Sequence, residues 1–99
     1  MRMMLRARMN TAKANEAAKS GTLPKVMGAF MEKAKPEAAY FTLDNGERTG
    51  FFVFDMKDSS QMPPLAEELF MALGADLHLT PVMNADEMRA GLAAAMAQK

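Results

Sequence analysis

The most constraining feature of the sequence is an Asn-Gly pair between two runs of aromatic and β-branched residues. Asn45 and Gly46 separate the run 38–43 from the run 48–56. Asn-Gly favours a two-residue turn in which both residues adopt a positive φ, and such a turn joins two antiparallel strands. The sequence therefore predicts a β-hairpin at this place.

The predicted turn also fixes which side chains share a face of the sheet, because successive residues of a strand point to opposite faces. Tyr40 is expected opposite Phe51, and Thr42 opposite Thr49. Residues 51–54 are apolar without alternation, which is typical of a strand covered on both sides. We therefore expect something to cover each face of this sheet.

Length and charge narrow the classes of protein that need consideration. The 99 residues predict a single domain spanning 1–99, and 12 basic against 12 acidic residues give a net charge of zero. Proteins that bind nucleic acids or acidic membrane surfaces usually carry a cluster of basic residues. This chain has no such cluster, so neither is an expected partner. The chain has no cysteine, no signal-peptide pattern and no apolar run of membrane-spanning length. We expect a soluble, cytoplasmic protein.

Patterning outside the hairpin predicts two further strands and several helical segments. Alternation is typical of strands at 2–9 and 77–83, and Pro81 suggests a strand at the sheet edge. Helical spacing is found at 11–19, at 22–35, from Ser59 or Ser60 as a cap to Gly74, and from 84 to about 97.

The resulting order is β-α-β-β-α-β with an added C-terminal helix. This is the ferredoxin-like split βαβ arrangement, an α+β fold with a four-stranded antiparallel sheet. Right-handed crossovers would place the first and third strands in the centre and the fourth at an edge. Both helices would cover one face, and the helix-free face would hold Arg2, Arg6, Arg8, Tyr40, Thr42, Thr49, Phe51, Val53, Asp55, His78 and Thr80.

In element order, length and face pattern, the chain resembles the dimeric α+β barrel superfamily. This resemblance implies that two sheets meet through their helix-free faces, and that small molecules bind on the sheet or under the helices. Relatives of this type include muconolactone-isomerase-like enzymes and cofactor-independent monooxygenases. The haem-degrading branch uses Asn, Trp and His, whereas this chain has no Trp and one His.

Arg6, Arg8 and His78 are the candidate ligand-binding residues, and His78 and Tyr40 are the candidate catalytic residues. Histidine titrates near neutral pH, and on an antiparallel pairing His78 could neighbour Arg8. His78 would then serve as a general base or proton shuttle, with Arg8 or Arg6 holding a carboxylate or enolate. Tyr40 would donate a hydrogen bond. The plainer interpretation is a half-exposed polar histidine at an interface.

The two arginines leave two interpretations open. A covered guanidinium needs a negative partner, which could be a small anionic ligand or the carboxylate of Asp55 on the same face. In the first case the arginines form a binding site, and in the second they form a structural bridge.

Three hypotheses for the function follow from these observations. The first is a small-molecule-binding homodimer whose organic ligand could be anionic. The second is a cofactor-free monooxygenase or isomerase, and the third is an interaction module with a filled dimer interface. No metal site and no cofactor are expected. Tyr40, Phe51 and Val53 would join the two subunits, and the C-terminal helix would dock through Met88, Leu92 and Met96 on its own sheet edge or on the partner.

Overall fold

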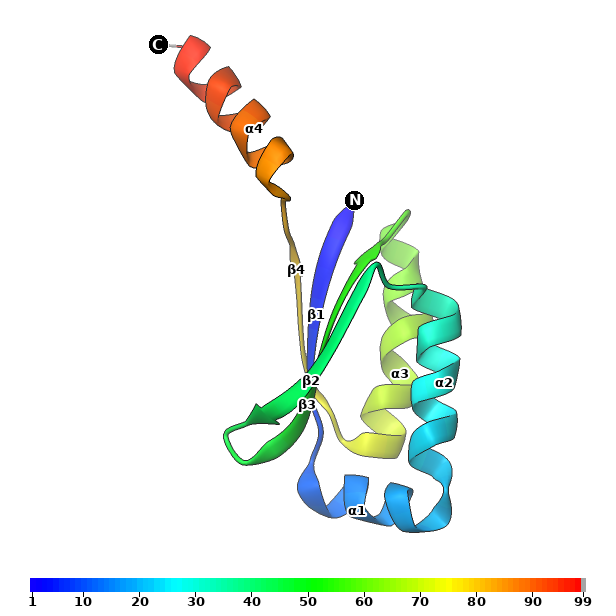
Figure 1. Ribbon diagram of the computed structural model, residues 1–99. Coiled ribbons are helices and arrows are strands. Elements are labelled where there is room, and N and C mark those ends of the chain that lie inside the picture. The colour runs from blue at the N-terminus through cyan, green and yellow to red at the C-terminus, as the bar shows by residue number, and fades with distance from the viewer. Residues whose placement is uncertain (99) are drawn as a thin grey trace.

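The computed structural model describes residues 1–98 and has an α+β fold built on one four-stranded antiparallel sheet (Figure 1). Its elements are β1 Arg2–Arg8, α1 Thr11–Ser20, α2 Thr22–Ala34, β2 Ala38–Asp44, β3 Glu47–Asp55, the 3-10 turn η1 Ser59–Gln61, α3 Met62–Leu73, β4 Asp76–Pro81 and α4 Ala85–Ala97. The strand order β2-β3-β1-β4 places β1 and β3 in the centre, as expected. The arrangement differs in detail from the ferredoxin-like order β-α-β-β-α-β, since η1 precedes α3 and β1 is joined to β2 by two helices, which lie at the two segments predicted to be helical.

The hairpin has the predicted register. Asn45 and Gly46 adopt φ values of 53° and 81°, which is the left-handed region that this kind of turn requires. Tyr40 pairs with Phe51, and Thr42 pairs with Thr49. The turn chemistry therefore sets the side chains of both strands on their expected faces.

The structure defines the residues at which α3 begins and ends and the residue at which β4 ends. Asp58, and not Ser59 or Ser60, caps the turn before α3, because its carboxylate accepts the N–H of Ser60 at 2.8 Å. Gly74 ends α3 with a φ of 54°, as predicted. β4 ends at Pro81, two residues before the predicted boundary, although the N–H of Val82 still donates to the carbonyl oxygen of Arg2 at 3.1 Å.

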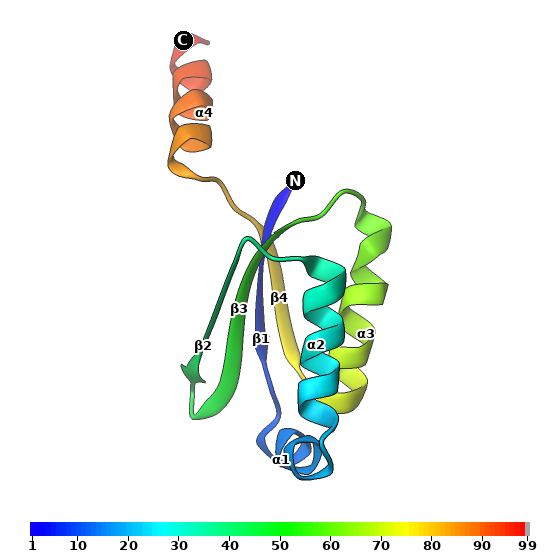
Figure 2. The ribbon, with the colours of Figure 1, turned by 45° about the vertical axis from the view of Figure 1, so that its right-hand side comes forward.

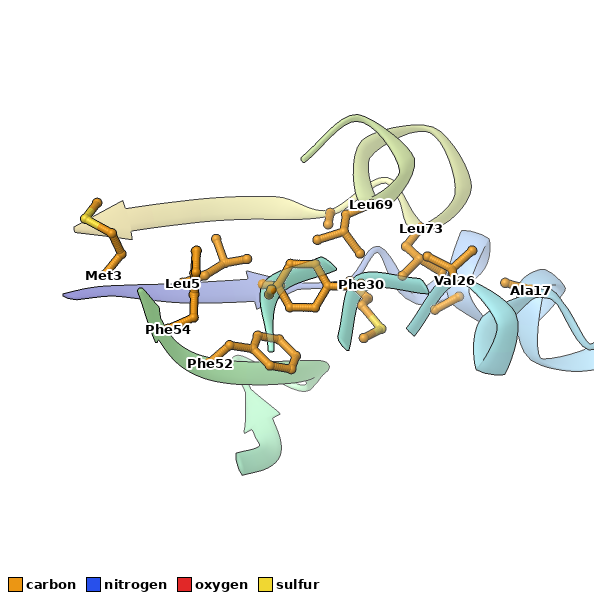
Figure 3. Close-up of a cluster of buried hydrophobic side chains, with 14 of the residues drawn as sticks. Met3, Leu5, Ala17, Val26, Phe30, Phe52, Phe54, Leu69 and Leu73 are labelled. Carbon is orange, nitrogen blue, oxygen red and sulfur yellow. The ribbon is translucent and has the colours of Figure 1, made fainter. Parts of the chain in front are cut away.

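The core lies between the sheet and the helices α2 and α3 (Figures 2 and 3). Phe52 and Phe54 point from β3 toward Phe30 of α2, and the Phe30 and Phe52 ring centroids are 4.7 Å apart. A Cβ at Gly50 would lie 2.7 Å from the ring of Phe52, so glycine is needed beside this ring. This packing fixes which face of the sheet the helices cover.

No helix of residues 1–98 lies on the opposite face of the sheet, and α4 extends away from the body of the fold. Both views show α2 and α3 on one side of the strands and α4 extending beyond the end of β4 (Figures 1 and 2). α4 therefore does not dock on its own sheet edge, which was one of the two predicted positions. Among residues 1–98, no helix combines the length and the apolar character needed to cross a membrane.

Candidate functional site

The helix-free face brings the predicted site residues into two neighbouring rows across the sheet. One row joins Tyr40, Phe51, Arg6 and His78, each paired with the next on adjacent strands. The partner of Arg6 on β4 is therefore His78, whereas the prediction placed His78 beside Arg8. The aromatic half of this row lies on β2 and β3, and the charged half lies on β1 and β4.

Arg8 lies in the second row, where its partner on β4 is Asp76. Its Nη2 donates to Asp76 Oδ2 at 3.1 Å, and its Nε lies 3.6 Å from Glu47 Oε1. His78 Nε2 lies 3.7 Å from the same Asp76 oxygen. Arg8 and His78 thus both lie within 4 Å of one carboxylate, and Arg8 alone donates a hydrogen bond to it.

Arg6 also has an acidic neighbour within the chain, although a more distant one. Its Nη1 lies 3.9 Å from Asp44 Oδ2 at the start of the hairpin turn. Three carboxylates therefore face the two guanidinium groups of this cluster. An anionic ligand would have to displace one of these carboxylates, because the cluster already has an excess of negative groups.

Asp55, the alternative partner of the arginines, is engaged elsewhere in the chain. Its Oδ1 accepts a hydrogen bond from the N-terminal ammonium of Met1 at 2.8 Å, and Lys57 Nζ lies 3.7 Å from its Oδ2. The hydrogen bond and the charge of the ammonium hold the pKa of Asp55 below its usual value. Within one chain, Asp55 does not bridge to Arg6 or Arg8.

The sequence did not reveal an apolar groove on the other side of the sheet, under α3. The groove has a volume of about 330 Å³. Side chains of the strands form its floor, and α3 forms its wall. Glu67 is the one charged residue of the lining. The main lining residues are Leu5, Phe54, Leu65, Phe70, Leu77 and Leu79. The sequence did contain one indication of this groove, since Met62 and Phe70 are apolar but lie outside the buried stripe of α3. In the structure they remain 42% and 43% exposed.

The groove and the charged rows are separate places. Residues 1–98 also form a groove over α1 and another beside the hairpin. Arg6, Arg8 and His78 line none of these three grooves. Tyr40 and the side chain of His78 are 72% and 53% exposed. In this part of the chain, no three His, Cys, Asp or Glu side chains lie close enough to hold a metal ion.

No protein-family model and no curated protein matches this chain. The resemblance to the dimeric α+β barrel proteins therefore rests on the order of the elements and on the face pattern.

Substitution of Arg8 by alanine separates the two interpretations of the arginines. Because Arg8 already has two carboxylate neighbours, we expect Arg8→Ala to lower the free energy of unfolding by up to about 1 kcal/mol, as for other half-exposed ion pairs. We also expect benzoate to leave the melting temperature of the unsubstituted protein unchanged. A benzoate-induced rise in melting temperature that Arg8→Ala abolishes would instead establish the anion site at Arg6, Arg8 and His78.

Proposed function

We propose that this chain is a cytoplasmic homodimer that binds a small, largely apolar organic molecule. The subunits would associate in the manner of the ferredoxin-like, dimeric α+β barrel proteins, through their helix-free sheet faces. The ligand would bind in the groove under α3. The observation that carries the binding role is this groove, because its volume and its apolar lining fall within the range of small-molecule sites.

The composition of the helix-free face supports the dimer. Tyr40 is 72% exposed, and Phe51 and Val53 are only half-buried although they lie in the middle of a sheet. A contiguous apolar patch on a small domain usually marks an interaction surface. A twofold axis through this face would cover the patch of each subunit with the same patch of the other.

The lining of the groove indicates the kind of ligand. The side chains that surround it are aliphatic or aromatic, and Glu67 is the only ionisable one. A carboxylate at the lining disfavours an anion, since like charges repel in a poorly hydrated site. A neutral aromatic compound therefore fits the groove better than an aromatic acid.

The enzyme hypothesis receives less support. A monooxygenase or isomerase of this type would need His78 or Tyr40 in an enclosed pocket. In the single chain both side chains lie on the open face, on the far side of the sheet from the groove under α3.

A thermal-shift titration tests the binding role. We expect indole, a neutral aromatic compound, to raise the melting temperature, because a ligand that binds only the native state stabilises it. Benzoate should have no such effect. Ala66→Trp should abolish the indole response, because Ala66 lines the groove and the larger side chain would fill it.

Ala18→Trp is the matched control, since Ala18 is an exposed residue of α1 outside the groove. Its indole response should equal that of the unsubstituted protein. An indole effect that survives Ala66→Trp would place the ligand elsewhere, and no response to any neutral aromatic compound would favour the interaction module.

A further inference from the structure

The helix α4 has an apolar stripe with no partner among residues 1–98. Met88, Leu92 and Met96 recur every four residues and therefore lie along one side of the helix. They are 45%, 54% and 54% exposed, and no residue of α4 is buried. An isolated helix of this length is marginally stable in water, so α4 requires a surface.

Contacts of the first turn of α4 with Arg2 fix the direction of the helix, so that the rest of α4 points away from the body of the fold. The N–H of Val82 donates to the carbonyl oxygen of Arg2 at 3.1 Å, and the Arg2 guanidinium bonds to the carboxylate of Glu87 in the first turn of α4. The same carboxylate accepts the N–H of Asn84 at 2.8 Å, which completes a capping box. The start of the helix is thus tied to the first residue of β1, and α4 extends outward in both views (Figures 1 and 2).

Arg2 is itself held in place on its other side. Its Nε donates to Glu37 Oε1 at 2.7 Å, just before β2. This hydrogen bond, together with the charges of Glu37 and Glu87, raises the pKa of Arg2 above its usual value. The guanidinium, which is charged at any physiological pH, links α4 to two parts of the body.

Among residues 1–98, no apolar element covers the groove under α3. Met62 and Phe70 lie at its margin with more than two-fifths of their surface exposed, and the floor is formed by Leu77 and Leu79 of the edge strand β4. A helix presenting methionine and leucine side chains at four-residue spacing is the kind of element that closes an apolar groove. Methionine also adapts to an irregular surface.

We propose that α4 of a second copy of this chain lies over the groove under α3, so that Met88 and Leu92 of the partner subunit complete the ligand site. The same chain carries both surfaces, so a twofold exchange of helices would satisfy both subunits and close the assembly. Charge is compatible with this pairing, because Arg89, the one basic residue of α4, keeps 66% of its side chain exposed beside its partner Asp86 on the same helix, and Glu67 is the one acidic residue of the groove. As a cover for a ligand, the helix rests on the proposed function of the groove.

Cross-linking tests the exchange directly, because the chain has no cysteine of its own. A tagged Leu92→Cys chain is co-expressed with an untagged Phe70→Cys chain and treated with a short bis-maleimide reagent. The proposal predicts a cross-link between the tagged and the untagged chain. Met62→Cys in place of Phe70→Cys should give the same product from the other end of the α3 wall of the groove.

Ala94→Cys is the matched control, because position 94 lies on the side of α4 opposite Leu92. Its cross-linking to Phe70→Cys should be at least fivefold weaker. Equal yields from Ala94→Cys and Leu92→Cys would overturn the proposal. So would cross-links only between two Leu92→Cys chains, or only within a single chain that carries both cysteines.

The failure of this inference can be told apart from the failure of the proposed function. The cross-link requires no ligand, whereas the indole titration reports on the groove itself. A mixed-chain cross-link without an indole response would leave α4 as a cover of a site that does not bind neutral aromatics. An indole response without the cross-link would leave a binding groove that α4 does not cover.

Discussion

Val53→Asp should convert the proposed dimer into a monomer that remains folded. Val53 lies on the central strand β3 and faces the helix-free side, where its neighbours are Met4 and Ala38. Between two subunits the new carboxylate would be buried without a partner, which typically costs 3 kcal/mol or more, so we expect the dimer Kd to rise by about a hundredfold or more. In the separated subunit this face is open to water, so the charge should be tolerated.

Sedimentation velocity and far-UV circular dichroism together check this result. Met71→Asp serves as the control, because Met71 is 71% exposed on α3, outside the helix-free face. The control should stay dimeric. If Val53→Asp also leaves the dimer unchanged, the subunits do not meet through this face.

Deletion of residues 85–99 should weaken the proposed dimer and reduce the indole response expected of the groove. Each methionine or leucine side chain of the α4 stripe contributes about 1.5–3 kcal/mol when fully buried, and in the proposed exchange each subunit buries such a stripe on the other. Removal of the helix should also open the groove to water. Melting temperature, molecular mass and the indole titration measure the three effects.

Leu92→Asp should reproduce part of the loss that the deletion causes, whereas Ala94→Asp on the opposite side of α4 should not. This pair separates the loss of the apolar stripe from a general change in helix stability. A truncated protein with unchanged melting temperature and mass would show that α4 docks on no part of the dimer.

The hairpin was predictable because its information is local. Asn45 and Gly46 determine the turn, and the turn determines that Tyr40 lies opposite Phe51. The central position of β1 and β3 also followed from the sequence, since the handedness of the crossovers leaves few alternatives.

The pairing between β1 and β4 was less predictable, because no turn joins these strands. His78 lies beside Arg6 and not beside Arg8, a shift of one row that changes which carboxylates surround each arginine. The partner of Asp55 was missed for a similar reason, since the ammonium of Met1 reaches it from the far end of the chain.

The groove and the direction of α4 depend on tertiary placement. The groove exists because of how α3 lies against the edge strand, and the spacing of Leu65 and Phe70 alone does not define it. The direction of α4 is set by Arg2 and Glu87, which are 85 residues apart in the sequence. Its apolar stripe was readable from the sequence, but its position outside the body was not.

Sedimentation equilibrium of the unsubstituted protein at micromolar concentration tests the central claim most directly. The chain has a mass of 10.8 kDa, and the account predicts a single species of twice that mass. A species of 10.8 kDa that persists as the concentration is raised would contradict it.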